Sequence, residues 1–184
     1  MLGTTMSASL SQAIMAGVKP GTLPNVNLSA DQSKNIAMLA EMFIPTTYTP
    51  GAIAAGVPEF IETIITEWYR VEERAIFMDG LAALDNATQA KEGVPYYKAS
   101  EALRVSLLTE HEQIASEYKA QAGFSLFGSK DDPNAPFFKK LKELVITGYY
   151  TSEIGCKEEQ IYKPMPGRNY DDLNYADFGR RFVS

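Results

Sequence analysis

The sequence predicts an all-α protein, an irregular bundle of about five helices flanked by extended N-terminal and C-terminal arms. Two observations predict this fold class. Apolar residues recur at helical spacing in several segments, and no pair of segments shows the turn signals of a β-hairpin. With 184 residues, of which 45% are hydrophobic and 22% charged, the chain is also long enough to bury a core without disulfides or metal ions.

The first helix is expected over residues 28–44. Ser29 is a typical N-cap residue, and four apolar side chains share one face: Ile36, Leu39, Ala40 and Phe43. Pro45 ends this helix, and residues 45–58 are predicted to form an ordered loop with at most one helical turn. Pro58 suits the first position of a second helix, whose inward face holds Ile61, Ile65 and Trp68.

A third and a fourth helix are expected in the middle of the chain. The third places one stripe of apolar side chains inward: Phe77, Leu81 and Leu84. Whether it is separate from the second helix or bent around Arg70 stays open from the sequence. The fourth helix covers residues 100–118, and its apolar stripe consists of Leu103, Leu107, Ile114 and Tyr118.

The fifth helix begins after Pro136. Its predicted inward face consists of Phe137, Leu141, Leu144, Val145 and Gly148. Its predicted outward face consists of Lys139, Lys140, Lys142 and Glu143. Beyond Gly155 the helical period is lost among prolines, glycines and aromatic residues, which indicates a long extended tail.

Three regions follow from these elements: an export-signal-like segment and linker over residues 1–27, a helical domain over 28–155, and an extended tail over 156–184 that wraps a partner. Residues 1–17 carry no charge and are rich in small and apolar side chains, like the middle and end of an export signal, but the basic start of such a signal is missing. The alternative is an ordinary N-terminal arm. No stretch approaches the length of a membrane-spanning helix, so we expect no direct membrane span.

Composition and charge exclude several function classes. A formal net charge of −6, spread along the chain, gives no basic stripe for nucleic acid. One histidine and one cysteine do not suffice for Cys-rich or multi-His metal sites. The glycines are isolated and follow no predicted strand, so no phosphate-binding loop is expected. We therefore expect no catalytic, metal-binding or cofactor-binding residues in this chain.

His111, between Glu110 and Glu112, is the one residue that invites a different interpretation. A zinc site on a helix needs a second histidine one turn away, and that position is Ala115. His111 also falls on the apolar stripe of the fourth helix, which favours a packed side chain. The alternative function is a stand-alone helical enzyme or ligand-binding module centred on His111.

The tail carries more large side chains than a small bundle can cover. Tyrosine and arginine are typical anchors of protein interfaces, so we expect a partner to contact this region. The candidate contact residues are Tyr149, Tyr150, Cys156, Tyr162, Pro164, Pro166, Arg168, Tyr170 and Tyr175. The alternative is a tail that folds back over its own helices.

Cys156 stands at the root of this tail, just past the predicted end of the fifth helix. In an exported protein an unpaired cysteine is either a buried thiol or bonded to another chain. Both interpretations, including an intersubunit disulfide at Cys156, stay open from the sequence.

The run FFKKLKEL at residues 137–144, followed by TGYYTSEIG at 147–155 and YKPMPG at 162–167, resembles the signature of the gluconate 2-dehydrogenase subunit 3 family. The resemblance extends more loosely over residues 28–184, through a first helix that ends in Phe43, Ile44 and Pro45 and a loop that contains AGVPEFIE.

This resemblance implies a helical small, or gamma, subunit without a cofactor of its own. It implies a heterodimer with a large FAD-dependent subunit of the glucose-methanol-choline type, such as a glucose or glucoside 3-dehydrogenase. The small subunit of such a complex supports folding or maturation like a chaperone. It is exported to the periplasm with its partner by the twin-arginine route, and electrons pass to a cytochrome c or a quinone. This sequence departs from the pattern because it lacks the Arg-Arg pair of the export signal.

Overall fold

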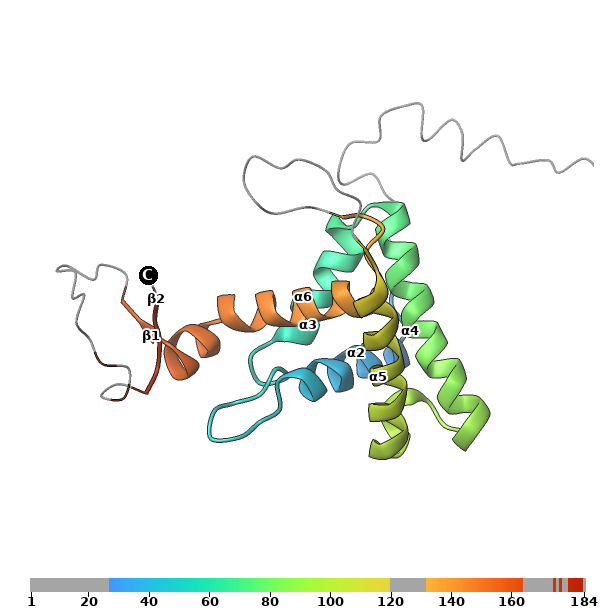
Figure 1. Ribbon diagram of the computed structural model, residues 1–184, viewed down its shortest axis with the longest axis horizontal. Coiled ribbons are helices and arrows are strands. Elements are labelled where there is room, and N and C mark those ends of the chain that lie inside the picture. The colour runs from blue at the N-terminus through green and yellow to red at the C-terminus, as the bar shows by residue number, and fades with distance from the viewer. Residues whose placement is uncertain (1–26, 120–131, 164–173, 175, 177–178, 184) are drawn as a thin grey trace, which may run out of the picture.

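The computed structural model describes residues 27–119, 132–163, 174, 176 and 179–183, and it confirms the predicted all-α fold class (Figure 1). The α-helices are α2 (Ala30–Phe43), α3 (Val57–Thr63), α4 (Val71–Glu92), α5 (Glu101–Glu117) and α6 (Phe137–Thr151). Two short helical segments connect successive helices, η1 (Ile64–Trp68) between α3 and α4 and η2 (Tyr96–Lys98) between α4 and α5, and a third, η3 (Gly155–Glu159), follows α6. Two strands, β1 (Ile161–Tyr162) and β2 (Phe182–Val183), pair in parallel near the C-terminus.

The first helix begins at the predicted cap. The Ser29 hydroxyl accepts a hydrogen bond from the backbone N–H of Gln32, and the Gln32 side chain accepts one from the Ser29 N–H. This reciprocal pair satisfies two backbone donors that a helix start otherwise leaves unbonded. Ser100 caps α5 in a similar way, through its hydroxyl and the Leu103 N–H. Both predicted starts are therefore confirmed.

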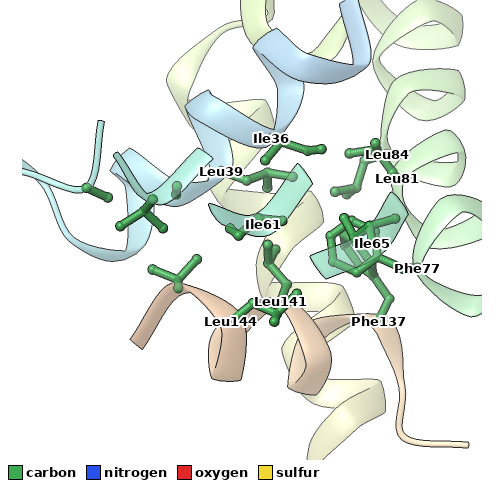
Figure 2. Close-up of a cluster of buried hydrophobic side chains, with 14 of the residues drawn as sticks. Ile36, Leu39, Ile61, Ile65, Phe77, Leu81, Leu84, Phe137, Leu141 and Leu144 are labelled. Carbon is green, nitrogen blue, oxygen red and sulfur yellow. The ribbon is translucent and has the colours of Figure 1, made fainter. Parts of the chain in front are cut away.

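The core lies where α6 crosses the other helices. Helix α6 contacts α2, α3, α4 and α5. Figure 2 shows the buried side chains that meet there: Ile36 and Leu39 from α2, Ile61 and Ile65 from α3 and η1, Phe77, Leu81 and Leu84 from α4, and Phe137, Leu141 and Leu144 from α6. Gly80 brings α4 and α6 together, because a Cβ at this position would overlap the Phe137 ring.

A buried polar cluster attaches the α4–α5 connection to α2. The Asn35 amide donates to Oδ1 of Asp85 at 2.9 Å, and its carbonyl oxygen accepts the Tyr97 N–H at 3.0 Å. The same Asp85 oxygen accepts the Tyr96 N–H. Asn35 is only 2% exposed, so these bonds replace the water contacts that its burial removes.

The second and third helices are separate. Between η1 and α4 the backbone of Tyr69 and Arg70 is extended. The buried Arg74 fixes this break, since its guanidinium donates to the carbonyl oxygens of Ile65 at 2.8 Å and Thr66 at 2.7 Å. The structure thus shows two separate helices and not one helix bent around Arg70, a choice that the helical spacing leaves open.

Three predicted orientations are wrong. Trp68 is 73% exposed, because it ends a π-helical segment whose wider turn rotates it off the face of Ile61 and Ile65. Ile114 is 60% exposed, since the buried row of α5 advances in steps of four residues and reaches Ala115 instead. Lys140, predicted to face solvent, is 4% exposed because it pairs with the buried Glu73.

Candidate partner-binding surface

The described part of the predicted contact region lies at the C-terminal end of α6 and continues through η3 into β1. Three of the predicted contact residues have exposed or half-buried side chains here: Tyr150 (40% exposed), Tyr162 (47%) and Cys156 (half-buried). Pro164, Pro166, Arg168, Tyr170 and Tyr175 lie outside the described residues. We call Ile146, Tyr150, Cys156 and Tyr162 the tail-root surface.

Tyr149 does not belong to this surface. Its side chain is 1% exposed, and its hydroxyl donates to the carbonyl oxygen of Pro50 at 2.8 Å. Burial raises the pKa of this hydroxyl, so it remains a donor at neutral pH. Tyr149 therefore joins α6 to the loop after α2, and it is withdrawn from the set of predicted contacts.

Ile146 is an exposed apolar residue that the sequence interpretation missed. It is 43% exposed and precedes Tyr150 by one helical turn, so the two side chains lie on the same face of α6. The signal in the sequence that could have identified Ile146 is its four-residue spacing from Tyr150. It is hard to recognise because the buried residues of α6 follow the same spacing on the neighbouring face.

Gly155 determines how the chain turns from α6 into η3. A Cβ at this position would collide with the carbonyl oxygen of Tyr149, so only glycine fits the close approach. Directly after it, the Cys156 thiol donates to the carbonyl oxygen of Tyr150 at 3.2 Å. The predicted extended backbone begins only after Glu159, because residues 155–159 form the helical turn η3.

The described ends of the tail meet at η3. In the parallel pair, Ile161 aligns with Phe182 and Tyr162 with Val183. The Arg180 guanidinium donates to the carbonyl oxygen of Glu158 at 3.1 Å, which satisfies an acceptor at the end of η3. Strands β1 and β2 therefore lie side by side next to η3, which carries Cys156 of the tail-root surface.

His111 packs against the core. Its ring meets the Phe137 ring edge-on, with 5.6 Å between the ring centroids. Burial lowers the pKa of His111, and the Glu110 carboxylate only partly opposes this effect. A neutral, packed imidazole suits the structural interpretation of His111. Within the described residues, no three His, Cys, Asp or Glu side chains gather as a set of metal ligands.

Among the described residues, no helix combines the length and the apolar composition that crossing a bilayer requires.

The sequence matches the family described as gluconate 2-dehydrogenase subunit 3 over residues 30–167, which is three quarters of the chain. The matched range includes the bundle, the tail-root surface and the YKPMPG segment. Neither the curated proteins nor the solved structures give a significant match. The chain belongs to the gluconate 2-dehydrogenase subunit 3 family, and it is thus an accessory subunit of a dehydrogenase complex.

Proposed function

We propose that this chain is the noncatalytic small subunit that binds and stabilises a large FAD-dependent dehydrogenase subunit of the glucose-methanol-choline type. The substrate of the large subunit is a sugar or a glycoside. The observation that carries the proposal is the family match over residues 30–167, which extends beyond the bundle into the tail. Binding of this kind stabilises a partner by mass action, by about 2.7 kcal/mol when the free subunit exceeds its Kd a hundredfold.

The tail-root surface is the proposed contact. Ile146 and Tyr150 present apolar area on a rigid helix, and Tyr162 follows on β1. Large side chains that are already held in place lose little conformational freedom on binding, which favours affinity. Exposed aromatic side chains of this kind are the typical anchors of protein interfaces.

The proposal extends to the place and the electron flow of the complex. FAD is held by the large subunit, which passes electrons to a cytochrome c or a quinone. The complex works in the periplasm, and the small subunit accompanies its partner through twin-arginine export and assists its maturation. These points follow from the family resemblance and are proposed together with the subunit role.

The test is co-purification of the affinity-tagged full chain from cells that also express a large FAD-dependent dehydrogenase subunit of the proposed type. We expect a larger chain with a flavin absorbance spectrum and sugar-dependent reduction of a dye, and neither property in the tagged chain alone. A strain that carries the tag on an unrelated protein is the control. Recovery of the tagged chain alone, as a stable monomer, from these cells would contradict the proposal.

The variant His111→Ala separates this proposal from an enzyme centred on His111. Because His111 packs on Phe137, the variant is expected to lower stability and to leave the sugar-dependent activity of the assembled complex within about twofold of wild type. Loss of activity in a complex that still assembles with full flavin content would favour the alternative.

A further inference from the structure

The loop between α2 and α3 presents an aromatic side chain that nothing in the described structure covers. Tyr48 is 91% exposed, the largest value among the large hydrophobic side chains in the described part of the chain, and Ile53 in the same loop is 51% exposed. We call residues 46–53 the Tyr48 loop. An exposed tyrosine in a loop does not by itself indicate a binding site. Whether Tyr48 can serve as an anchor depends on how rigidly its loop is held and on where the loop lies.

Glu41 holds the Tyr48 loop from the end of α2. One carboxylate oxygen accepts both the backbone N–H and the hydroxyl of Thr46, each at 2.8 Å. The other oxygen accepts the N–H of Ile53 at 3.0 Å. Both ends of the loop are thus bonded to one side chain on a helix, which fixes the loop in place.

The interior of the loop is equally constrained. The Thr46 hydroxyl accepts the Gly51 N–H at 3.0 Å, and the Thr47 N–H donates to the carbonyl oxygen of Thr49 at 3.0 Å. A Cβ on Gly51 would lie 2.6 Å from the Thr46 nitrogen, closer than real side chains approach. Only glycine fits there, so a substitution at Gly51 must displace the loop.

The loop is also bonded to the elements that carry the tail-root surface. Pro50 accepts the Tyr149 hydroxyl from α6, and the Thr49 hydroxyl donates to the Glu159 carboxylate of η3 at 3.1 Å. In Figure 1 the loop projects from the bundle on the same side as the C-terminal end of α6. Tyr48 is therefore an exposed aromatic residue on a rigid support, bonded to the two elements, α6 and η3, that carry most of the tail-root surface.

We infer that the Tyr48 loop is a second contact arm for the large dehydrogenase subunit, with Tyr48 as its anchor. This inference rests on the proposed function. The chemistry of a tyrosine calls for a pocket with apolar walls and a hydrogen-bond partner for the hydroxyl at its end. The large subunit is the occupant because the loop is hydrogen-bonded to α6 and η3, which carry the proposed contact residues Tyr150 and Cys156. A preformed loop also keeps the entropy cost of binding small.

The test is a competition for assembly. Wild-type and variant full chains with different tags are co-expressed with the large subunit, and their ratio in the flavin-containing complex is measured by mass spectrometry. Tyr48→Ala is expected to be at least about tenfold under-represented, as for an interface anchor. Val105→Ala, which truncates an exposed side chain on α5, is the matched control and should compete equally.

A second pair of variants tests whether the rigid loop acts through Tyr48. Gly51→Ala should also compete poorly while the circular dichroism spectrum stays unchanged. The double variant should compete no worse than Tyr48→Ala alone, because once the anchor is gone its support has nothing to position. Full additivity of the two losses would show that Gly51 acts independently of Tyr48.

The outcomes separate the two proposals. If wild-type chain captures no flavoprotein, the proposed function fails. If wild type assembles and Tyr48→Ala competes equally with it, the subunit role stands and the Tyr48 arm is wrong. The other possible occupant of the loop is a second copy of this chain, and sedimentation of the chain alone tests it. If Tyr48→Ala abolishes self-association and leaves the competition unchanged, the loop contacts that second copy, and the inference is overturned.

Discussion

At the residue scale, the pair of Lys140 and Glu73 shows how tertiary packing overrides a surface pattern. Their side chains are only 5% and 9% exposed, with 3.5 Å between the lysine nitrogen and the nearer carboxylate oxygen. Lys140 also donates to the carbonyl oxygen of Asp132, and its nitrogen lies 5.3 Å from the Tyr69 ring centroid. Each charge is tolerated in the interior because the other is present.

Removing only one of these charges should therefore be costly. We expect Lys140→Met to lower the free energy of unfolding by about 3 kcal/mol, because Glu73 would stay buried without its counter-charge. The double variant Lys140→Met/Glu73→Gln should recover most of this loss. Urea denaturation followed by circular dichroism measures both, with the exposed Lys142→Met as the control. Equal stabilities of the single and double variants would contradict the claim that the unpaired charge of Glu73 causes the loss.

Glu41 gives the Tyr48 loop a dependence on pH. Partial burial of this carboxylate, the largest single effect, raises its pKa, but the hydrogen bonds from Ile53 and Thr46 together outweigh it, so the pKa lies below the ordinary value of 4.5. A group whose pKa is lower in the folded state stabilises the fold above the unfolded value and loses this contribution as the pH falls through the folded one.

The stability difference between wild type and Glu41→Gln should accordingly be constant at neutral pH and shrink as the pH falls below 4.5. Urea denaturation midpoints at a series of pH values measure it. Glu67→Gln, on the exposed side of η1, is the control for general acid effects. A difference that stays constant far below pH 4.5 would mean that ionised Glu41 does not hold the loop.

At the element scale, the sequence predicted the helices better than their faces. Caps such as Ser29 and Ser100 are local features, so the helix starts could be located from the chain alone. Trp68 could not be placed, because a π-helical turn changes the spacing on which the face was counted. Lys140 could not be placed either, since its partner Glu73 is distant in sequence and only the packing of α4 against α6 brings the two together.

The tail beyond η3 is a separate element whose removal should leave the bundle intact. We expect truncation after Gln160 to keep the helical circular dichroism spectrum, because the core side chains all precede that residue. Recovery of the large subunit in the co-purification should fall at least about tenfold, through loss of Tyr162 and the rest of the tail. Full recovery would assign the main contact to the helices.

A second variant, truncated after Ile154, provides the comparison. It removes η3 and with it the Glu159 carboxylate that accepts the Thr49 hydroxyl. The Tyr48 loop should loosen in this variant and keep its structure in the variant truncated after Gln160. Hydrogen exchange at the loop amides distinguishes the two variants.

At the scale of the whole molecule, Cys156 lies where the bundle gives way to the tail, half-buried beside Tyr150. This is a place that a partner chain on the tail-root surface would cover. If an intersubunit disulfide forms there, non-reducing electrophoresis of the purified complex should show one band that separates into two on reduction. The variant Cys156→Ser should give two bands in both conditions. Two bands from wild type without reductant would exclude the bond.

Which residues of the proposed contact surface are exposed could be predicted only in part from the sequence. The abundance of aromatic residues near the tail pointed to Tyr150 and Tyr162, but it also included Tyr149, which a hydrogen bond to a distant loop draws into the core. Tyr48 was missed because its loop is held by Glu41 and Glu159, and no local pattern records those contacts. Whether a side chain is exposed depends on the whole fold, whereas its residue type can be read directly from the sequence.

The position of Trp68 has a consequence for how this protein can be studied. It is the chain's one tryptophan, and at 73% exposure its indole already meets water in the folded state. Unfolding should therefore shift its fluorescence emission little, so denaturation is better followed by far-ultraviolet circular dichroism. The same indole becomes a built-in optical probe: a blue shift on assembly would mean that a partner covers the corner between η1 and α4.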